Sequence, residues 1–152
     1  MVLAAGEPAP EFSLARASGG EPFTHHDLAG HTTVLVFYPF AFSTVCTDQM
    51  GVYNELLDEF TARGATLYGV SCDAVWSQRA WREQLGIDIE QLSDFEPKGQ
   101  TCRAFGVLHE RGMPERALVV IGPDRVIKWS YQAPQLGDLP GANLIFDALD
   151  NN

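Results

Sequence analysis

Hydrophobic residues gather into short runs along the chain, and the two longest strand-like runs are separated by a stretch with helical spacing. Residues 33–38 are apolar at nearly every position, which is typical of a strand covered on both faces of a sheet. Residues 66–71 predict a second buried strand, and residues 45–63 between them predict one long helix that ends at Gly64. The apolar side of this helix is formed by Val52, Leu56, Leu57 and Phe60. Two buried strands joined by a helix predict a right-handed crossover.

Weaker patterns extend this unit at both ends. Further strands are predicted at residues 11–15, 21–24, 89–93, 116–121 and 126–131, further helices at 74–85, 99–105 and 141–149, and a polar or single helical turn at 24–30. The sequence Gly-Pro-Asp-Arg at 122–125 is a strong hairpin signal between the last two strands. The order predicts a single α/β domain over residues 1–152, with a central mixed β-sheet flanked by helices. This order fits the thioredoxin fold.

Charge and composition exclude several classes of function. The chain has 10 Lys and Arg residues against 20 Asp and Glu residues, and its net charge of −10 repels phosphate backbones, so no nucleic-acid partner is expected. No apolar run reaches about 18 residues, so no membrane span is expected. The N-terminus lacks the basic and apolar regions of a secretory signal, and three cysteines argue against a secreted disulfide scaffold. We therefore expect a cytoplasmic protein. The turn with His25, His26 and Asp27 shows no matching ligand pair, even with Asp48, so no metal site is expected.

Cys46 lies where a buried strand, a proline-broken loop and a helix start follow one another. The predicted strand stops at Pro39, and Cys46 falls close to the start of the long predicted helix. Unpaired N–H groups and the helix dipole favour an anion there, so a thiol in this position ionises more easily. No second cysteine stands at C-x-x-C spacing, because these positions hold Ser43 and Gln49. The pattern favours a single reactive thiolate over a dithiol–disulfide exchanger. The alternative is a buried structural cysteine.

The residues that precede Cys46 resemble the active-site signature of the peroxiredoxins. Residues 39–46 read P-F-A-F-S-T-V-C, which matches P-x-x-x-[T/S]-x-x-C. Further matches extend along most of the chain: A-P-x-F from Ala9, L-x-G-x-x-x-V-L-V-F-Y-P from Leu28, V-S-x-D from Val70, Trp81, L-S-D from Leu92, A-F-G-V from Ala104 and R-A-L-V-V-I from Arg116. Within the family, the chain is most similar to the small one-cysteine alkyl hydroperoxide reductase E type of actinobacteria. The resemblance implies a thioredoxin fold with a peroxiredoxin-type N-terminal extension and a thiol peroxidase activity.

The resemblance also implies a role for each residue of the signature. Cys46 would be the peroxidatic cysteine, whose thiolate attacks a hydroperoxide and becomes a sulfenic acid. Ser43 would hold the peroxide, and Arg116 would favour the thiolate and stabilise charge on the leaving oxygen. Pro39 would shield the sulfur from water, and the backbone N–H groups of Val45 and Cys46 would donate further hydrogen bonds. On the residues alone, Arg116 is interpreted as a surface strand arginine and Ser43 as a helix N-cap.

Other residues near the signature are candidates for substrate contact. The apolar loop residues Phe40, Ala41 and Phe42 are expected to be exposed and are candidates for contact with substrate or with a second subunit, and the family analogy leads us to expect a homodimer. Trp81 resembles an aromatic residue near the family's arginine, with core packing as the alternative. Gln49 stands where many family members have glutamate, so it can hydrogen-bond Arg116 but cannot form an ion pair with it. The resemblance implies hydrogen peroxide, alkyl or fatty-acid hydroperoxides, or peroxynitrite as substrates, without metal, haem or flavin.

Cys72 and Cys102 bear on how a sulfenic acid at Cys46 is reduced. Both are interpreted as inert core thiols, with a resolving role as the alternative. No cysteine follows residue 102, and none stands five residues after Cys46. We therefore expect a one-cysteine cycle with an external thiol reductant, such as mycothiol, a glutaredoxin-like protein or a thioredoxin-like protein. The rival interpretations are an atypical two-cysteine cycle through Cys102 or Cys72, and a non-enzymatic redox sensor or holdase.

Overall fold

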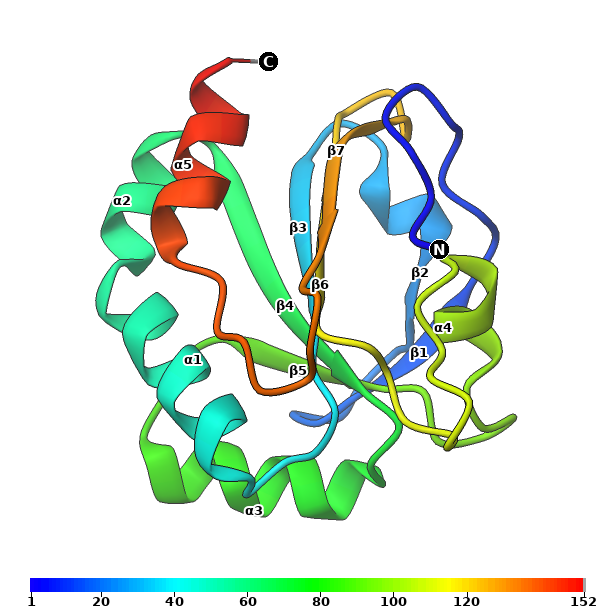
Figure 1. The fold of residues 1–152 in the computed structure, drawn as a ribbon, viewed down its shortest axis with the longest axis vertical. Coiled ribbons are helices and arrows are strands. Elements are labelled where there is room, and N and C mark those ends of the chain that lie inside the picture. Colours follow the sequence, from blue (N-terminus) through cyan, green and yellow to red (C-terminus); the bar gives the residue numbers. More distant parts are fainter. Residues whose placement is uncertain (152) are drawn as a thin grey trace.

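Seven strands form one sheet in the computed structural model, which describes residues 1–151 (Figure 1). The strands are β1 (Ser13–Arg16), β2 (Phe23–Thr24), β3 (Thr32–Phe37), β4 (Ala65–Ser71), β5 (Glu90–Ser93), β6 (Ala117–Ile121) and β7 (Ile127–Gln132). The helices are the 3₁₀ turn η1 (His25–Leu28) and α1 (Thr44–Glu55), α2 (Leu57–Ala62), α3 (Val75–Leu85), α4 (Gln100–Ala104) and α5 (Ala142–Asp150). The strands lie in the order β2-β1-β5-β4-β3-β6-β7.

The two strongly apolar runs form the centre of the sheet. β3 runs parallel to β4, and β4 runs parallel to β5, whereas β6 pairs antiparallel with both β3 and β7. Parallel neighbours need a crossover connection, and α1 and α2 provide it between β3 and β4. The predicted β6–β7 hairpin is present, and β1 pairs antiparallel with β2. The predicted α/β architecture, a central mixed sheet flanked by helices, is confirmed.

Side chains of alternate residues along the strands enter two separate cores. Val34 and Val36 point into the core under α1, α2, α3 and α5, together with Trp81 and Ile145. Leu35 and Phe37 point to the other face, where Phe105 and the N-terminal segment cover them. Figure 1 shows α1, α2 and α5 on one side of the sheet, with α4 and the N-terminus on the other. β3 is thus buried on both faces, as its apolar run predicts.

The long helix predicted over residues 45–63 is divided in two, and its buried face was predicted only in part: Phe60 is buried, and Leu56 and Leu57 pack against the core. Leu56 leaves the helical conformation (φ −105°, ψ 13°), which separates α1 from α2. Val52, assigned to the apolar side, is 43% exposed. The buried face of α1 consists of Cys46, Gln49, Met50 and Tyr53. These residues follow helical spacing, but two of the four are a cysteine and an amide, so hydrophobicity alone does not reveal this face.

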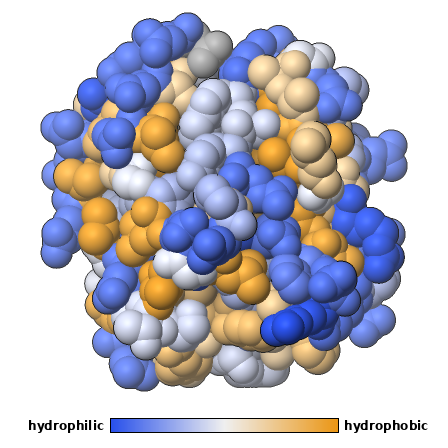
Figure 2. Space-filling model, viewed as in Figure 1, coloured by the Kyte–Doolittle hydropathy of each residue, from blue (hydrophilic) through white to orange (hydrophobic). Residues whose placement is uncertain are grey.

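The surface carries both hydrophilic and hydrophobic residues. On the face shown in Figure 2, hydrophobic residues lie in several separate groups between hydrophilic ones. Among the described residues, none of the helices has both the length and the apolar character that crossing a bilayer requires.

Candidate active site

Cys46 lies in the first turn of α1, completely buried. The helix begins after Ser43, and its first helical hydrogen bond runs from the N–H of Thr47 to the carbonyl of Ser43 (2.9 Å). The N–H groups of Val45 and Cys46 precede this bond, so the helix supplies no acceptor for them. The sulfur therefore sits beside the partly positive end of a helix, where an anion is favoured.

The loop between β3 and α1 is held by a residue of the neighbouring strand end. The N–H of Ala41 donates to Asp73 Oδ2 (2.8 Å), and the N–H of Ser43 donates weakly to the carbonyl of Phe40 (3.4 Å). Phe42 has a φ of +72°, which a bulky side chain adopts at a cost of roughly 1–2 kcal/mol. Pro39 is buried, which fits its expected role of covering the site.

Arg116 connects the start of β6 to Cys46. Its side chain is buried, with only 2% exposed, and its Nη2 donates a hydrogen bond to Cys46 Sγ at 3.1 Å. Nη1 donates to Gln49 Oε1 at 2.6 Å, and Nε donates to the carbonyl of Leu136 at 2.8 Å. Among the described residues, no carboxylate pairs with this guanidinium. A thiolate at Cys46 would therefore be the anion that balances its buried charge.

Gln49 links Arg116 to a second buried side chain. Gln49 Nε2 donates to the hydroxyl of Tyr53 (3.2 Å), and this hydroxyl donates to the carbonyl of Pro140 (2.5 Å). Burial raises the pKa of Tyr53 to about 12, although the bond from Gln49 and the charge of Arg116 act in the opposite direction. Tyr53 is thus neutral at physiological pH and donates to a fixed backbone acceptor. The amide at position 49 makes the hydrogen bond expected of it.

The candidate substrate contacts differ in their surroundings. Ser43 occupies the N-cap position of α1, but its hydroxyl makes no capping hydrogen bond. Phe40 and Phe42 are about half exposed (50% and 51%), which leaves them accessible to substrate or to another subunit. Trp81 is 1% exposed, and its indole N–H donates to the hydroxyl of Thr47 (3.1 Å). Its packing is thus in the core beneath α1, and it contacts the site through the helix that carries Cys46.

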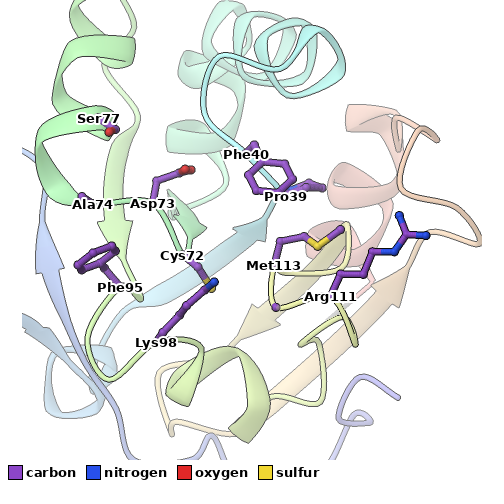
Figure 3. A pocket seen from close by; sticks show the side chains of 11 residues that line it. Pro39, Phe40, Cys72, Asp73, Ala74, Ser77, Phe95, Lys98, Arg111 and Met113 are labelled. Carbon is purple, nitrogen blue, oxygen red and sulfur yellow. The ribbon is translucent and has the colours of Figure 1, made fainter.

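The other two cysteines lie in the core on the opposite face of the sheet from Cys46. Among the described residues, Cys72, Asp94 and Cys102 form the group of side chains with spacing suited to a metal ion. A cavity of about 330 Å³ adjoins Cys72 and is also lined by Pro39 and Phe40 (Figure 3). Cys46 does not line it.

Two supporting side chains were not predicted from the sequence. Asp73 anchors the active-site loop, and Tyr53 completes the chain of hydrogen bonds from Arg116. Asp73 follows a parallel strand adjacent to β3, and polar residues at the carboxyl ends of neighbouring parallel strands often share a site, so this signal was available. Tyr53 stands four residues after Gln49, and this helical spacing gives a weaker signal.

Comparisons with known proteins identify the family of this chain. A model of the AhpC/TSA family matches residues 5–130. Alkyl hydroperoxide reductase E of Mycobacterium tuberculosis is 29% identical over 150 residues, with 97% of each chain covered. A peroxiredoxin of Thermoplasma volcanium is 28% identical over 139 residues, covering 88% of this chain and 68% of the relative. The chain spans about two thirds of the length of this relative and of a Thermoplasma acidophilum peroxiredoxin.

The fold is shared with solved structures. The crystal structure of Enterococcus faecalis AhpC matches with a TM-score of 0.87 at 28% identity, covering 99% of this chain and 92% of that one. The resemblance to peroxiredoxins, the thioredoxin-type fold and the class of thiol peroxidase are thereby confirmed at the level of the family. The chain belongs to the AhpC/TSA family and is a peroxiredoxin.

Proposed function

We propose that this chain reduces hydroperoxides through Cys46, in a one-cysteine cycle completed by an external thiol. The observation that carries the proposal is the 3.1 Å contact between Arg116 Nη2 and Cys46 Sγ in a buried site without a carboxylate on the guanidinium among the described residues. This contact favours the anionic sulfur, which is the nucleophilic form of cysteine.

The proposed chemistry uses groups already near the sulfur. The Cys46 thiolate attacks the terminal oxygen of the peroxide, the O–O bond breaks, and the leaving oxygen takes a proton from solvent, which gives a sulfenic acid and an alcohol or water. The Ser43 hydroxyl and the N–H groups of Val45 and Cys46 hold the peroxide, while Arg116 stabilises charge on the leaving oxygen. Since the sulfur is completely covered, the peroxide reaches it when the loop at 40–43 moves. The strained backbone of Phe42 supports such a movement.

The reductant, substrate and assembly are proposed from weaker support. Cys46 lies in a different core from Cys72 and Cys102, which supports reduction by an external thiol such as mycothiol, a glutaredoxin-like or a thioredoxin-like protein. The similarity to alkyl hydroperoxide reductase E over nearly the whole chain supports organic hydroperoxides as substrates besides hydrogen peroxide. The exposed Phe40 and Phe42 support a homodimer contact at this loop.

Stopped-flow fluorescence of the wild type and Cys46→Ser tests the proposal. Both proteins are mixed with hydrogen peroxide and with a fatty-acid hydroperoxide, and steady-state peroxide consumption is then followed with dithiothreitol as reductant. We expect a fast second-order signal and many turnovers in the wild type, and neither in Cys46→Ser. A reaction no faster than that of a free thiol would exclude the peroxidase. A fast single oxidation without turnover with any thiol would instead favour a redox sensor.

A further inference from the structure

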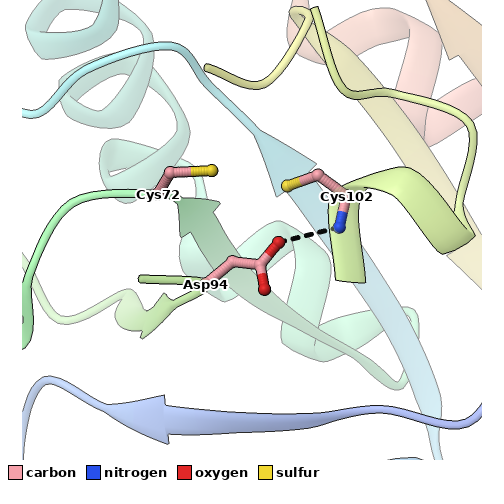
Figure 4. A group of neighbouring side chains, drawn as sticks. All are labelled: Cys72, Asp94 and Cys102. Carbon is pink, nitrogen blue, oxygen red and sulfur yellow. Dashed lines mark hydrogen bonds between the residues drawn. The ribbon is translucent and has the colours of Figure 1, made fainter. Parts of the chain in front are cut away.

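Two further thiols lie on the opposite face of the sheet from Cys46, near the carboxyl ends of β4 and β5. Cys72 follows β4, Asp94 follows β5, and Cys102 lies on α4. The two Sγ atoms and a carboxylate oxygen of Asp94 lie within 4.8 Å of one another. Figure 4 shows the two sulfur atoms directed toward each other, with Asp94 beside them.

Asp94 fixes the backbone of both cysteines at this separation. Its N–H donates to the carbonyl of Ser71, the residue before Cys72, at 2.8 Å. Its carboxylate accepts from the N–H of Thr101 (3.1 Å) and from the N–H of Cys102 (2.8 Å). Both carboxylate oxygens therefore already serve as hydrogen-bond acceptors for the chain. Asp94 thus acts in this group as a positioning residue rather than as a free metal ligand.

The two thiols differ in access and in charge environment. Cys72 is 8% exposed and lines the cavity of about 330 Å³, where Lys98 extends toward it (Figure 3). A hydrogen bond from Cys102 lowers the pKa of Cys72, with a smaller contribution from the charge of Lys98, although partial burial and the charge of Asp94 act in the opposite direction. Cys102 is completely buried, and its hydrogen bond to Cys72 together with burial raises its pKa. Cys72, the less buried of the two thiols, is therefore the better nucleophile, and Cys102 keeps its proton.

We propose that Cys72 and Cys102 form a second redox site, a dithiol that hydroperoxides oxidise to an intramolecular disulfide independently of Cys46. The thiolate of Cys72 attacks the terminal oxygen of the hydroperoxide, the O–O bond breaks, and the alcohol leaves with a proton from solvent. Cys72 is then a sulfenic acid, oxidised by two electrons. The sulfur of Cys102 attacks that of Cys72, an S–S bond replaces the S–O bond, and water leaves with the proton of Cys102. Two equivalents of an external thiol return the pair to the dithiol by exchange.

The test uses the full chain with Cys46→Ser, so that its result does not depend on the proposed peroxidase. The protein is incubated with one to ten equivalents of hydrogen peroxide, alkylated, and analysed by intact mass and by non-reducing peptide mapping. We expect a loss of two hydrogens and a cross-linked peptide pair that contains Cys72 and Cys102. The matched variant Cys46→Ser/Cys102→Ala should instead gain one oxygen at Cys72, trapped with dimedone.

Two results would overturn this inference. The first is recovery of both Cys72 and Cys102 as alkylated thiols in Cys46→Ser after treatment with ten equivalents of hydrogen peroxide. The second is tight one-to-one binding of Zn²⁺ that protects both thiols, with no disulfide formed from the metal-free protein, which would assign the group to a metal instead. The thiol count in Cys46→Ser decides the question even if the Cys102→Ala variant fails to fold.

Discussion

Replacing Arg116 by methionine removes the positive charge beside Cys46 and keeps a long apolar side chain in the same space. Unit charges 3.1 Å apart, the distance from Nη2 to Sγ, attract each other by roughly 5 kcal/mol at an effective dielectric constant of about 20. Removal of one partner from a buried charge pair typically costs about 3–5 kcal/mol. Each 1.36 kcal/mol corresponds to about a factor of ten in rate. We therefore expect the second-order rate constant of Arg116→Met with hydrogen peroxide to fall about 10²- to 10⁴-fold.

The assay is stopped-flow fluorescence at neutral pH, with urea unfolding to establish that the variant is folded. Arg103→Met is the matched control, because it removes an exposed arginine from α4, and its rate should stay within about twofold of the wild type. Arg116→Lys keeps the charge but loses the fork that contacts Cys46 and Gln49 together, so an intermediate rate is expected. A folded Arg116→Met variant that reacts within tenfold of the wild type would refute the role given to this contact.

Three further predictions concern the residues around this contact. Trp81→Phe should remove most of the fluorescence change that follows mixing with peroxide, because the Trp81 indole hydrogen-bonds to α1, the helix that carries Cys46. The rate of peroxide consumption should stay within about threefold of the wild-type rate. A tenfold lower rate would instead indicate that Trp81 contacts the substrate. Ser43→Ala should slow oxidation about 5- to 30-fold, the effect of one lost hydrogen bond of about 1–2 kcal/mol, with unfolding free energy changed by less than about 0.5 kcal/mol, because the hydroxyl does not cap α1. A stability loss without a rate loss would contradict this. The raised pKa of Tyr53, about 12 in the folded chain against 10.0 in the unfolded chain, favours the neutral hydroxyl in the fold. The stabilising effect of this raised pKa is complete below pH 10 and is lost as the pH rises toward 12. The free energy of unfolding, measured with urea at pH 9 and at pH 11, should therefore decrease between the two pH values by about 1.3 kcal/mol less in Tyr53→Phe than in the wild type. Equal losses in the two proteins would disprove the assignment.

The sheet could be predicted because its strands carry strong local signals. Residues 33–38 and 66–71 are apolar on both faces, and the turn at 122–125 contains residues typical of a hairpin. The structure confirms these strands, and no bound is shifted by more than one residue. The break at Leu56 had no comparable signal, since no glycine or proline marks it.

The active site was predictable only in part, for a physical reason. A helix that buries its apolar side reveals its orientation through hydrophobic spacing, and Val52 suggested the wrong side of α1. The face that is buried carries Cys46, Gln49 and Tyr53, whose polar groups are satisfied by Arg116 and by the carbonyl of Pro140. These partners lie on distant segments of the chain.

Burial of a polar helix face depends on partners supplied by distant segments, and this dependence ties the fold of α1 to its chemistry. Arg116 satisfies Gln49 and Cys46 simultaneously, so the guanidinium that would activate the sulfur also orients the helix that carries it. Gln49 contributes no charge, which leaves the sulfur as the anion that Arg116 can pair with among the described residues. A glutamate at this position would compete with the thiolate for the same guanidinium. The amide would therefore concentrate the effect of Arg116 on a thiolate at Cys46.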